Sequence, residues 1–272
     1  MKRVIVTADD FGISPAVNEA VERAHRQGIL GAASLMVAGA AAADAVQRAR
    51  AMPTLRVGLH LVLVEGRAVL PHAAIPDLVD RDGWFDANQW GRGFAYFFRP
   101  AVRRQLAAEI AAQFAAYAAT GLPLDHADAH KHMHLHPTVA RLMIAIGRRH
   151  GLRSIRVPAE PPSVLAACGS APDLGARALY RWSRVLRWQA RRADLAVADQ
   201  VFGIAWSGAV NAMHLRQLAA HLPGGVSELY LHPSCAQPEA ELAALLDPRV
   251  AAAFREAGAA FSAYGELAAS AG

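Results

Sequence analysis

The chain has 272 residues, of which 54% are hydrophobic, and a formal net charge of +5. Its length fits one α/β barrel of roughly 250 residues, and its apolar content is too high for a disordered chain. No nucleic-acid-binding signature accompanies the positive charge, so we expect no nucleic-acid partner. Cys168 and Cys235 are too few for a disulfide framework and favour a reducing compartment.

The N-terminal residues do not have the pattern of a secretion signal. Asp9 and Asp10 follow only five mainly apolar positions, which is too short for the core of a signal peptide. The longest uncharged stretch, residues 27–43, is rich in Ala and Gly and shorter than a membrane span. We therefore expect a cytoplasmic protein that is soluble or attached peripherally to the inner face of the membrane.

Predicted strands and helices alternate along the chain. Residues 4–8 form an apolar, β-branched run typical of a buried strand, and residues 14–28 contain a Ser-Pro helix start, helical spacing and a Gly stop. The same patterns predict strands at 33–37, 56–64, 124–130, 154–157, 227–231 and 260–263, and helices at 41–51, 103–119, 137–150, 214–221 and 249–258. This alternation predicts one α/β domain over residues 1–272, with a parallel sheet covered by helices.

Two insertions interrupt the alternation. Residues 66–100 combine Pro, Gly and Asp with an aromatic cluster and are predicted to be a long loop or lid. Residues 158–200 begin with a Pro-rich turn and continue into a basic helix with Tyr180, Trp182 and Trp188. Within residues 177–192 the apolar side chains do not form one stripe, so the pattern favours a shallow contact with an anionic membrane over deep insertion. A solvated helix with its tryptophans packed on the barrel is the alternative.

Residues of the types that ligate metals lie where the predicted strands end. Asp9 and Asp10 follow the first strand, His60 lies in the third, and His232 follows the strand at 227–231. The carboxyl ends of parallel strands form the functional face of an α/β barrel. One carboxylate and two imidazoles would leave coordination positions open for water and substrate, as a catalytic metal requires. Taken singly, the acids also suit a turn before a helix, and His60 suits a core position.

The segment DHADAHKHMHLHP, residues 125–137, is rich in histidine. Alternation along a strand places six polar side chains on one side: His126, Asp128, His130, His132, His134 and His136. Burying such a row is costly unless a charge or a metal satisfies it, and an exposed loop is the alternative. Because only one or two neighbours in a row reach a single ion, the remaining histidines would be supporting or substrate-facing groups.

Several motifs together resemble the YdjC-like carbohydrate deacetylase family. They are ADDFG at 8–12, GLHLVL at 58–63, HADAHKHMHLHP at 126–137, IRVP at 155–158 and YLHP at 230–233. The longer stretches TADDFGISPAVNEAVERAH and AHKHMHLHPTV are most similar to the hopanoid-biosynthesis-associated branch. The resemblance implies an imperfect (β/α) barrel of the polysaccharide-deacetylase-like type. It also implies hydrolysis of the N-acetyl group of an N-acetylglucosamine-type sugar, which is lipid-linked in that branch.

The resemblance also implies roles for individual residues. Asp10, His60 and His130 match the family's metal ligands. Asp9 matches the catalytic base, and His232 matches a catalytic acid. We expect His232, after the strand at 227–231, to lie across the barrel from Asp9. One divalent ion is therefore expected, and both Mg²⁺ and Zn²⁺ are compatible with these ligand types.

Other residues are less clearly assigned. Arg156, at the end of a predicted strand, is expected to orient the base or to contact substrate, with a surface salt bridge as the alternative. Ala129 and Lys131 replace the Ser and the further polar residue that many family members have around the ligand histidine. This departure leaves the contacts around that ligand open.

Two other functions remain alternatives. A metal-dependent phosphoesterase would normally hold a second ion, for which the extra histidines offer ligands. A non-catalytic protein that binds a sugar or lipid is the second alternative, although such a protein has no need of a proton acceptor like Asp9 beside the metal. The natural substrate and the oligomeric state, a homodimer included, are left open.

Overall fold

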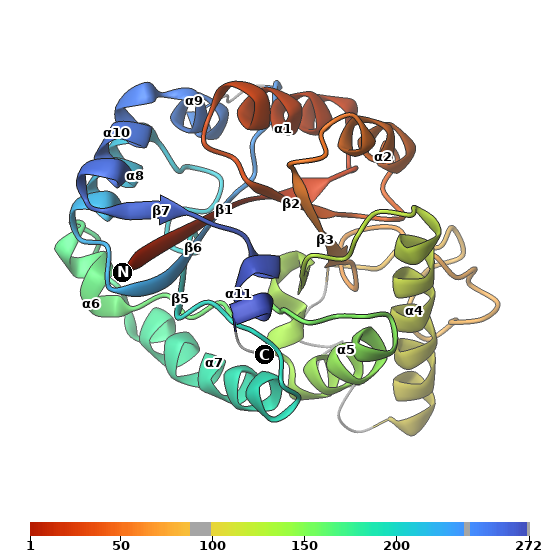
Figure 1. The fold of residues 1–272 in the computed structure, drawn as a ribbon. Helices are drawn as coiled ribbons and strands as arrows, with labels where there is room; N and C mark the ends of the chain where they lie inside the picture. Colours follow the sequence, from red (N-terminus) through yellow and green to blue (C-terminus); the bar gives the residue numbers. More distant parts are fainter. Residues whose placement is uncertain (88–98, 237–239, 271–272) are drawn as a thin grey trace.

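The computed structural model describes residues 1–87, 99–236 and 240–270 (Figure 1). Its central sheet has the strand order β4-β3-β2-β1-β6-β5, and β7 pairs with β1. The strands are β1 Lys2–Phe11, β2 Ala32–Leu35, β3 Arg56–Leu61, β4 Ala127–Ala129, β5 Gln200–Phe202, β6 Gly225–Leu231 and β7 Ala259–Phe261. The pairings recorded between these strands are all parallel, which confirms the predicted parallel sheet.

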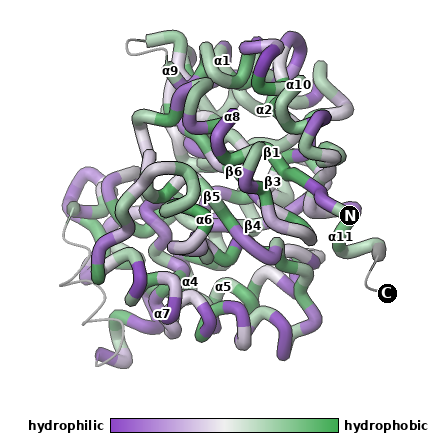
Figure 2. Tube along the Cα trace, turned by 90° about the vertical axis from the view of Figure 1, so that its left-hand side faces the viewer, coloured by the Kyte–Doolittle hydropathy of each residue, from purple (hydrophilic) through white to green (hydrophobic). Residues whose placement is uncertain are grey.

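Helices surround the curled sheet (Figure 1). They are α1 Pro15–Gln27, α2 Ala42–Arg50, α4 Pro100–Ala119, α5 Pro137–Arg149, α6 Pro162–Ala167, α7 Leu174–Arg192, α8 Ala212–Ala220, α9 Ala240–Leu246, α10 Pro248–Glu256 and α11 Tyr264–Ser270, with a 3₁₀ helix η1 at His130–Leu135. Hydrophilic positions recur along the outer helices α4, α5 and α7 (Figure 2), whereas β2 is buried along its whole length. The α/β fold of a curled parallel sheet inside a layer of helices is therefore confirmed.

The predicted start and stop of the first helix are confirmed in atomic detail. Ser14 caps α1 by accepting a hydrogen bond from the backbone N–H of Val17, and Gly28 ends the helix. Inside α1, the buried Asn18 side chain accepts a bond from Gly12 N at 2.8 Å and donates to a backbone carbonyl of the loop before α2. The first helix therefore holds the turn that follows Asp9 and Asp10.

The barrel closes only loosely between β4 and β5. Residues 154–157, predicted to be a strand, form isolated bridges instead: Ala127 pairs with Ile155, and Ser154 pairs with Ala196. The prediction of a regular strand was wrong, because the chain there forms only one bridge with each neighbour although its backbone bonds to both. Through these bridges, backbone pairing continues from β4 toward the segment that precedes β5. The sequence did not reveal β5 itself, which is a short strand.

The described part of the first insertion is more ordered than the predicted loop. Antiparallel bridges join Arg67 to Trp84 and Val79 to Phe85. Trp90, Phe94, Tyr96, Phe97 and Phe98 of the predicted aromatic cluster lie outside the described residues. No helix in the described ranges is both long enough and apolar enough to cross a bilayer.

Candidate active site

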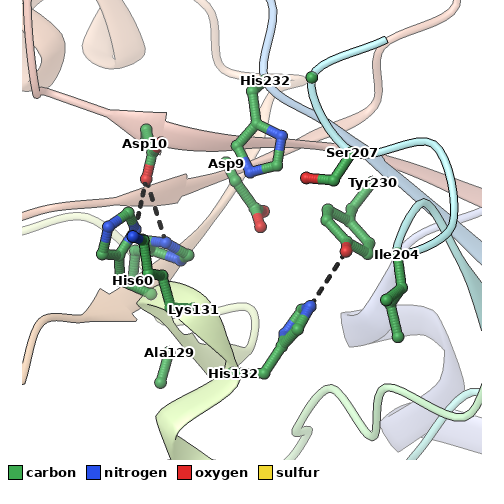
Figure 3. Close-up of a pocket in the computed structure, with 12 residues that line it drawn as sticks. Asp9, Asp10, His60, Ala129, Lys131, His132, Ile204, Ser207, Tyr230 and His232 are labelled. Carbon is green, nitrogen blue, oxygen red and sulfur yellow. Dashed lines mark hydrogen bonds and ion pairs between the residues drawn. The ribbon is translucent and has the colours of Figure 1, made fainter. Parts of the chain in front are cut away.

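The carboxyl ends of the strands surround one pocket of about 370 Å³ (Figure 3). It is lined by Asp9, Asp10, His60, Ala129, His130, Lys131, His132, Ile204, Ser207, Gly208, Tyr230 and His232. These residues come from β1, β3, β4, η1, the loop after β5, and β6. The fold thus brings together five of the six predicted site residues as lining groups; the sixth, Arg156, lies beneath them.

Asp10, His60 and His130 form a cluster of potential metal ligands at the pocket. His130 Nδ1 lies 3.0 Å from Asp10 Oδ1, and His60 Nε2 lies 3.2 Å from the same oxygen. One donor atom from each residue lies within 4.8 Å of the other two. Asp10 has a positive φ of 61°, a strained conformation that typically occurs at functional sites.

The geometry around His60 fits a cation. Its Nε2 atom is buried and has no hydrogen-bond partner, which is rare for a polar atom inside a protein. Its other nitrogen, Nδ1, lies 2.9 Å from Asp128 Oδ1. A divalent ion coordinated by Asp10, His60 and His130 would satisfy the unpartnered nitrogen, so the residues fit a metal centre.

The local charges also favour a cation. Burial raises the pKa of Asp10, but the neighbouring His130 and His60 rings outweigh it and hold that pKa below its usual range. Burial lowers the pKa of His60, but the Asp128 and Asp9 carboxylates outweigh it and raise that pKa well above its usual value. The negative field that favours a proton at His60 also favours a metal ion there.

Asp128, which the sequence placed only in a row of polar side chains, contacts the His60 ring. Its Oδ2 accepts a hydrogen bond from Ser34 Oγ at 3.2 Å and forms an ion pair with Arg156. Burial raises the pKa of Asp128, but Arg156 and His60 outweigh it and hold the pKa well below its usual value. Because an ionised carboxylate only accepts, His60 Nδ1 carries the hydrogen in their contact and Nε2 is left to face Asp10.

Asp128→Asn is expected to weaken divalent-metal binding by about 10- to 100-fold, because the amide no longer fixes the His60 ring as a charged acceptor does. Metal titration against a competing chelator measures this. Ser34→Ala is the matched control, since it removes one donor to Asp128 and leaves the contact with His60, so we expect a smaller loss. Equal affinity in Asp128→Asn and the unsubstituted protein would contradict this role.

Arg156 lies at the centre of a buried ionic network. Its side chain is fully buried and donates two hydrogen bonds to Asp9, at 2.6 and 2.8 Å. The guanidinium also pairs with Glu228 at 2.8 Å and with Asp128. The surface salt bridge considered from the sequence is therefore excluded. Since Arg156 does not line the pocket, its contacts favour orienting Asp9 over touching substrate.

His232 lies beside Asp9. The sequence-based expectation that it faces Asp9 across the barrel was wrong, because β6 pairs directly with β1 and aligns Leu231 with Ala8. Figure 3 shows the His232 ring and the Asp9 carboxylate on the same side of the pocket. Glu241 fixes the backbone at this point by accepting a bond from His232 N at 2.5 Å.

The histidine-rich segment does not continue as one strand. β4 ends at Ala129, and Lys131 and His132 have positive φ angles of 50° and 54°. These left-handed residues turn the chain, so the predicted placement of six side chains on one side was wrong. The exposed-loop alternative is also wrong, because His126 and His134 are fully buried.

The other histidines of the segment have separate contacts. His132 lines the pocket and lies 3.0 Å from the hydroxyl of Tyr230. Three others contact protein groups outside the ligand cluster. His126 stacks on the Tyr264 ring, His134 bonds to the Arg156 carbonyl, and His136 accepts a hydrogen bond from the backbone N–H of Thr138. Glu228 is a further missed residue, and its charge within β6, whose other residues are uncharged, was the available signal.

The sequence model of one protein family, described as YdjC-like protein, matches residues 3–256. The chain belongs to the YdjC-like protein family. A carbohydrate deacetylase of Geobacillus stearothermophilus is 31% identical over 265 residues, which cover 97% of each chain. The family-level resemblance seen in the motifs is thereby confirmed.

Other relatives align over a shorter segment. A carbohydrate deacetylase of Brevibacillus brevis is 37% identical over 160 residues, which span 59% of each chain. A chitooligosaccharide deacetylase of Serratia marcescens is 34% identical over 152 residues, or 56% of this chain and 58% of the relative. These two alignments therefore span less than two thirds of the relatives' lengths.

Solved structures confirm the fold of this YdjC-like protein. A protein of Enterococcus faecalis, with a suggested role in cellobiose-phosphate cleavage, superposes with a TM-score of 0.76 at 22% identity, covering 98% of both chains. A lactam utilization protein of Thermus thermophilus has a TM-score of 0.54 at 16% identity, covering 96% of this chain and 99% of the other. At these identities the likeness is one of fold alone.

Proposed function

We propose that this YdjC-like protein is a metal-dependent deacetylase that hydrolyses the N-acetyl group of an N-acetylglucosamine-type sugar, within one domain over residues 1–272. The observation that carries the proposal is the buried, unpartnered Nε2 of His60, which faces Asp10 in a pocket also lined by Asp9. Relatives named as carbohydrate deacetylases support the reaction class. An Asp held by an Arg beside a cation site is suited to activating water.

Asp10, His60 and His130 would hold one divalent ion, Mg²⁺ or Zn²⁺. When bound, such an ion polarises a carbonyl group and lowers the pKa of a coordinated water. Two imidazoles and one carboxylate suit Zn²⁺, and the set is compatible with Mg²⁺ when water oxygens fill the rest of its coordination shell. The chemistry of the donor set therefore leaves the choice between these two ions to metal analysis.

The remaining residues would move the protons. The water oxygen attacks the acetyl carbon, and Asp9 accepts the proton that the water releases. Two hydrogen bonds from Arg156 fix the Asp9 carboxylate for this step. As the C–N bond breaks, His232 donates a proton to the departing sugar nitrogen, and acetate is the second product.

His232→Ala is expected to remove the alkaline limb of the pH profile of kcat, because that limb reports loss of the proton from the general acid. Steady-state rates across the pH range measure it. Metal content should be unchanged, since His232 is outside the ligand cluster. If the alkaline limb persists, the acid is another group, and His132 is the other pocket-lining histidine outside the ligand cluster.

The alternative functions receive less support. In the described chain, Asp9, His60 and Asp128 form a second group of potential ligands, but Arg156 pairs with both of its carboxylates. That pairing disfavours a second ion and hence a two-metal phosphoesterase. A non-catalytic binding protein would not require Asp9 to be held at the pocket wall by a buried arginine.

Acetate release tests the proposal. The purified protein would be assayed with an N-acetylglucosaminyl glycolipid, a chitooligosaccharide and a phosphoester, before and after chelation and readdition of Mg²⁺ or Zn²⁺. Release of acetate that is lost on chelation and restored by metal is the expected result. Phosphate release without acetate release would favour the phosphoesterase, and binding without turnover would favour the binding protein.

A narrower proposal concerns the substrate. The similarity of the first motif and the histidine segment to the hopanoid-biosynthesis-associated branch supports a lipid-linked N-acetylglucosamine, handled by a cytoplasmic enzyme at the inner face of the membrane. Faster acetate release from the glycolipid than from the chitooligosaccharide is the expected result. The reverse order would argue for a soluble oligosaccharide.

A further inference from the structure

Helix α7 carries positive charge without any acid of its own. Its sequence, LGARALYRWSRVLRWQARR, contains arginine but neither Asp nor Glu. Arg187 is used internally, since it donates to the carbonyls of Ala198 and Asp199 at 3.0 and 2.8 Å. The other arginines are exposed: Arg177, Arg181, Arg184, Arg191 and Arg192. Among the residues that the structure describes, none of these five forms an ion pair.

Large apolar side chains are exposed on the same helix. Leu174 is 85% exposed, Trp188 58% and Trp182 47%. The Trp188 ring lies beneath the guanidinium of Arg192, 5.1 Å from ring centre to carbon. The side of α7 that faces the protein is formed by Ser183, Leu186 and Ala190, and hydrophilic positions recur along the helix (Figure 2). We call the exposed arginines and tryptophans of this helix the α7 face.

The α7 face begins beside the active-site pocket. Tyr180 and Ile204 line a common small cavity, and Ile204 also lines the active-site pocket. Trp182 Nε1 donates a hydrogen bond of 2.9 Å to the Leu135 carbonyl, at the end of the 3₁₀ helix that begins with His130. A surface bound by α7 would therefore lie close to two walls of the pocket.

We propose that the α7 face docks the protein on an anionic membrane surface beside the pocket mouth. Arginine side chains attract anionic headgroups, and tryptophan side chains prefer the interface between headgroups and acyl chains. Both residue types are exposed together on this helix, which supplies the charge complementarity. The proposal deepens the proposed function, since docking would bring a lipid-linked substrate to the deacetylase pocket.

Two other occupants fit the α7 face less well. A second copy docked face to face through α7 would place arginines against arginines, and like charges across an interface are strongly unfavourable. Single-stranded nucleic acid is usually bound in a groove that follows its backbone, whereas the α7 face is the outer side of a helix. A planar anionic surface is the better match.

Vesicle sedimentation of the full chain tests the docking. The protein is expected to bind phosphatidylcholine vesicles that contain phosphatidylglycerol, to release them at high salt, and not to bind phosphatidylcholine alone. Replacing Arg181, Arg184 and Arg191 by Gln should weaken binding on the order of a hundredfold, since each arginine contributes about fivefold. Trp188→Ala should weaken binding as well.

The matched control removes the same charge elsewhere. Arg104, Arg216 and Arg255 are exposed on α4, α8 and α10, and their replacement by Gln should leave most vesicle binding intact. Equal weakening by both triple variants, or no binding to anionic vesicles at low salt, would overturn the proposal. Tighter binding to single-stranded RNA, lost in the α7 variant, would also overturn it by assigning the face to nucleic acid.

Activity separates this proposal from the proposed function. All of these variants should release acetate from a soluble chitooligosaccharide at the rate of the unsubstituted protein, because none of the substituted residues lines the pocket. If no substrate yields acetate while vesicle binding persists, the deacetylase proposal fails and the docking surface stands. Both proposals are supported if the α7 variant loses acetate release from vesicle-borne glycolipid and keeps it with the soluble chitooligosaccharide.

Discussion

Asp9→Asn is expected to retain the metal and to lose at least about 100-fold in kcat, as loss of a general base typically does. Asp9 lies outside the Asp10, His60 and His130 cluster, and its carboxylate is held by Arg156. An amide of the same shape cannot accept a proton from water. Metal analysis of the purified variant and steady-state kinetics with an N-acetylated substrate measure the two effects.

Asp10→Asn is the matched comparison, because the change in side chain is identical one residue away. Asp10 has both histidine ligand atoms within 3.2 Å, so its loss should remove the metal. If both variants lose metal equally, or if Asp9→Asn loses it and Asp10→Asn does not, the roles of these two residues are merged or reversed.

Arg156→Lys is expected to lower the free energy of unfolding by about 1–3 kcal/mol, the usual range when buried acceptors lose their hydrogen-bond donors. A lysine keeps the charge, but one ammonium group cannot reproduce the forked hydrogen bonds that Arg156 makes with Asp9 and Glu228. Because a domain is stable by only about 5–15 kcal/mol, the effect should be large. Urea unfolding measures it.

The control for Arg156→Lys is Arg249→Lys. Arg249 pairs with Asp247 on the surface, where an ion pair contributes little, so no measurable change in the urea midpoint is expected. In Arg156→Lys, kcat should also fall, because Asp9 loses its two fixed hydrogen bonds. An Arg156→Lys variant with unchanged stability and kcat would show that the buried network neither stabilises the fold nor orients Asp9.

Local patterns in the sequence were sufficient for the α/β architecture. The start and end of α1 were predictable because Ser14 and Gly28 act on backbone groups within a few residues. The strands β1, β3 and β6 were predictable from apolar runs, which must be buried wherever the chain folds. β1 carries Asp9 and Asp10, and β3 carries His60, so the sequence also placed these chemical groups at one face of the barrel.

The exact partners of those groups depended on tertiary structure. Arg156 meets Asp9, which lies 147 positions away in the sequence, and Glu228, 72 positions away. Periodicity and capping reach only a few residues, so neither can indicate which charged side chains meet inside the barrel. The same limit hid the contact of Asp128 with His60, which supports the candidate metal centre.

The sequence by itself determined the parallel α/β fold, the family and the residue types available for chemistry. Only the tertiary structure decided that Arg156 is buried beneath Asp9 and that His232 lies beside Asp9. It also decided that the histidine segment turns after Ala129. The physical reason is that strand pairing sets which chain ends are neighbours. A left-handed residue such as Lys131 redirects every side chain that follows, and neither effect has a local signature.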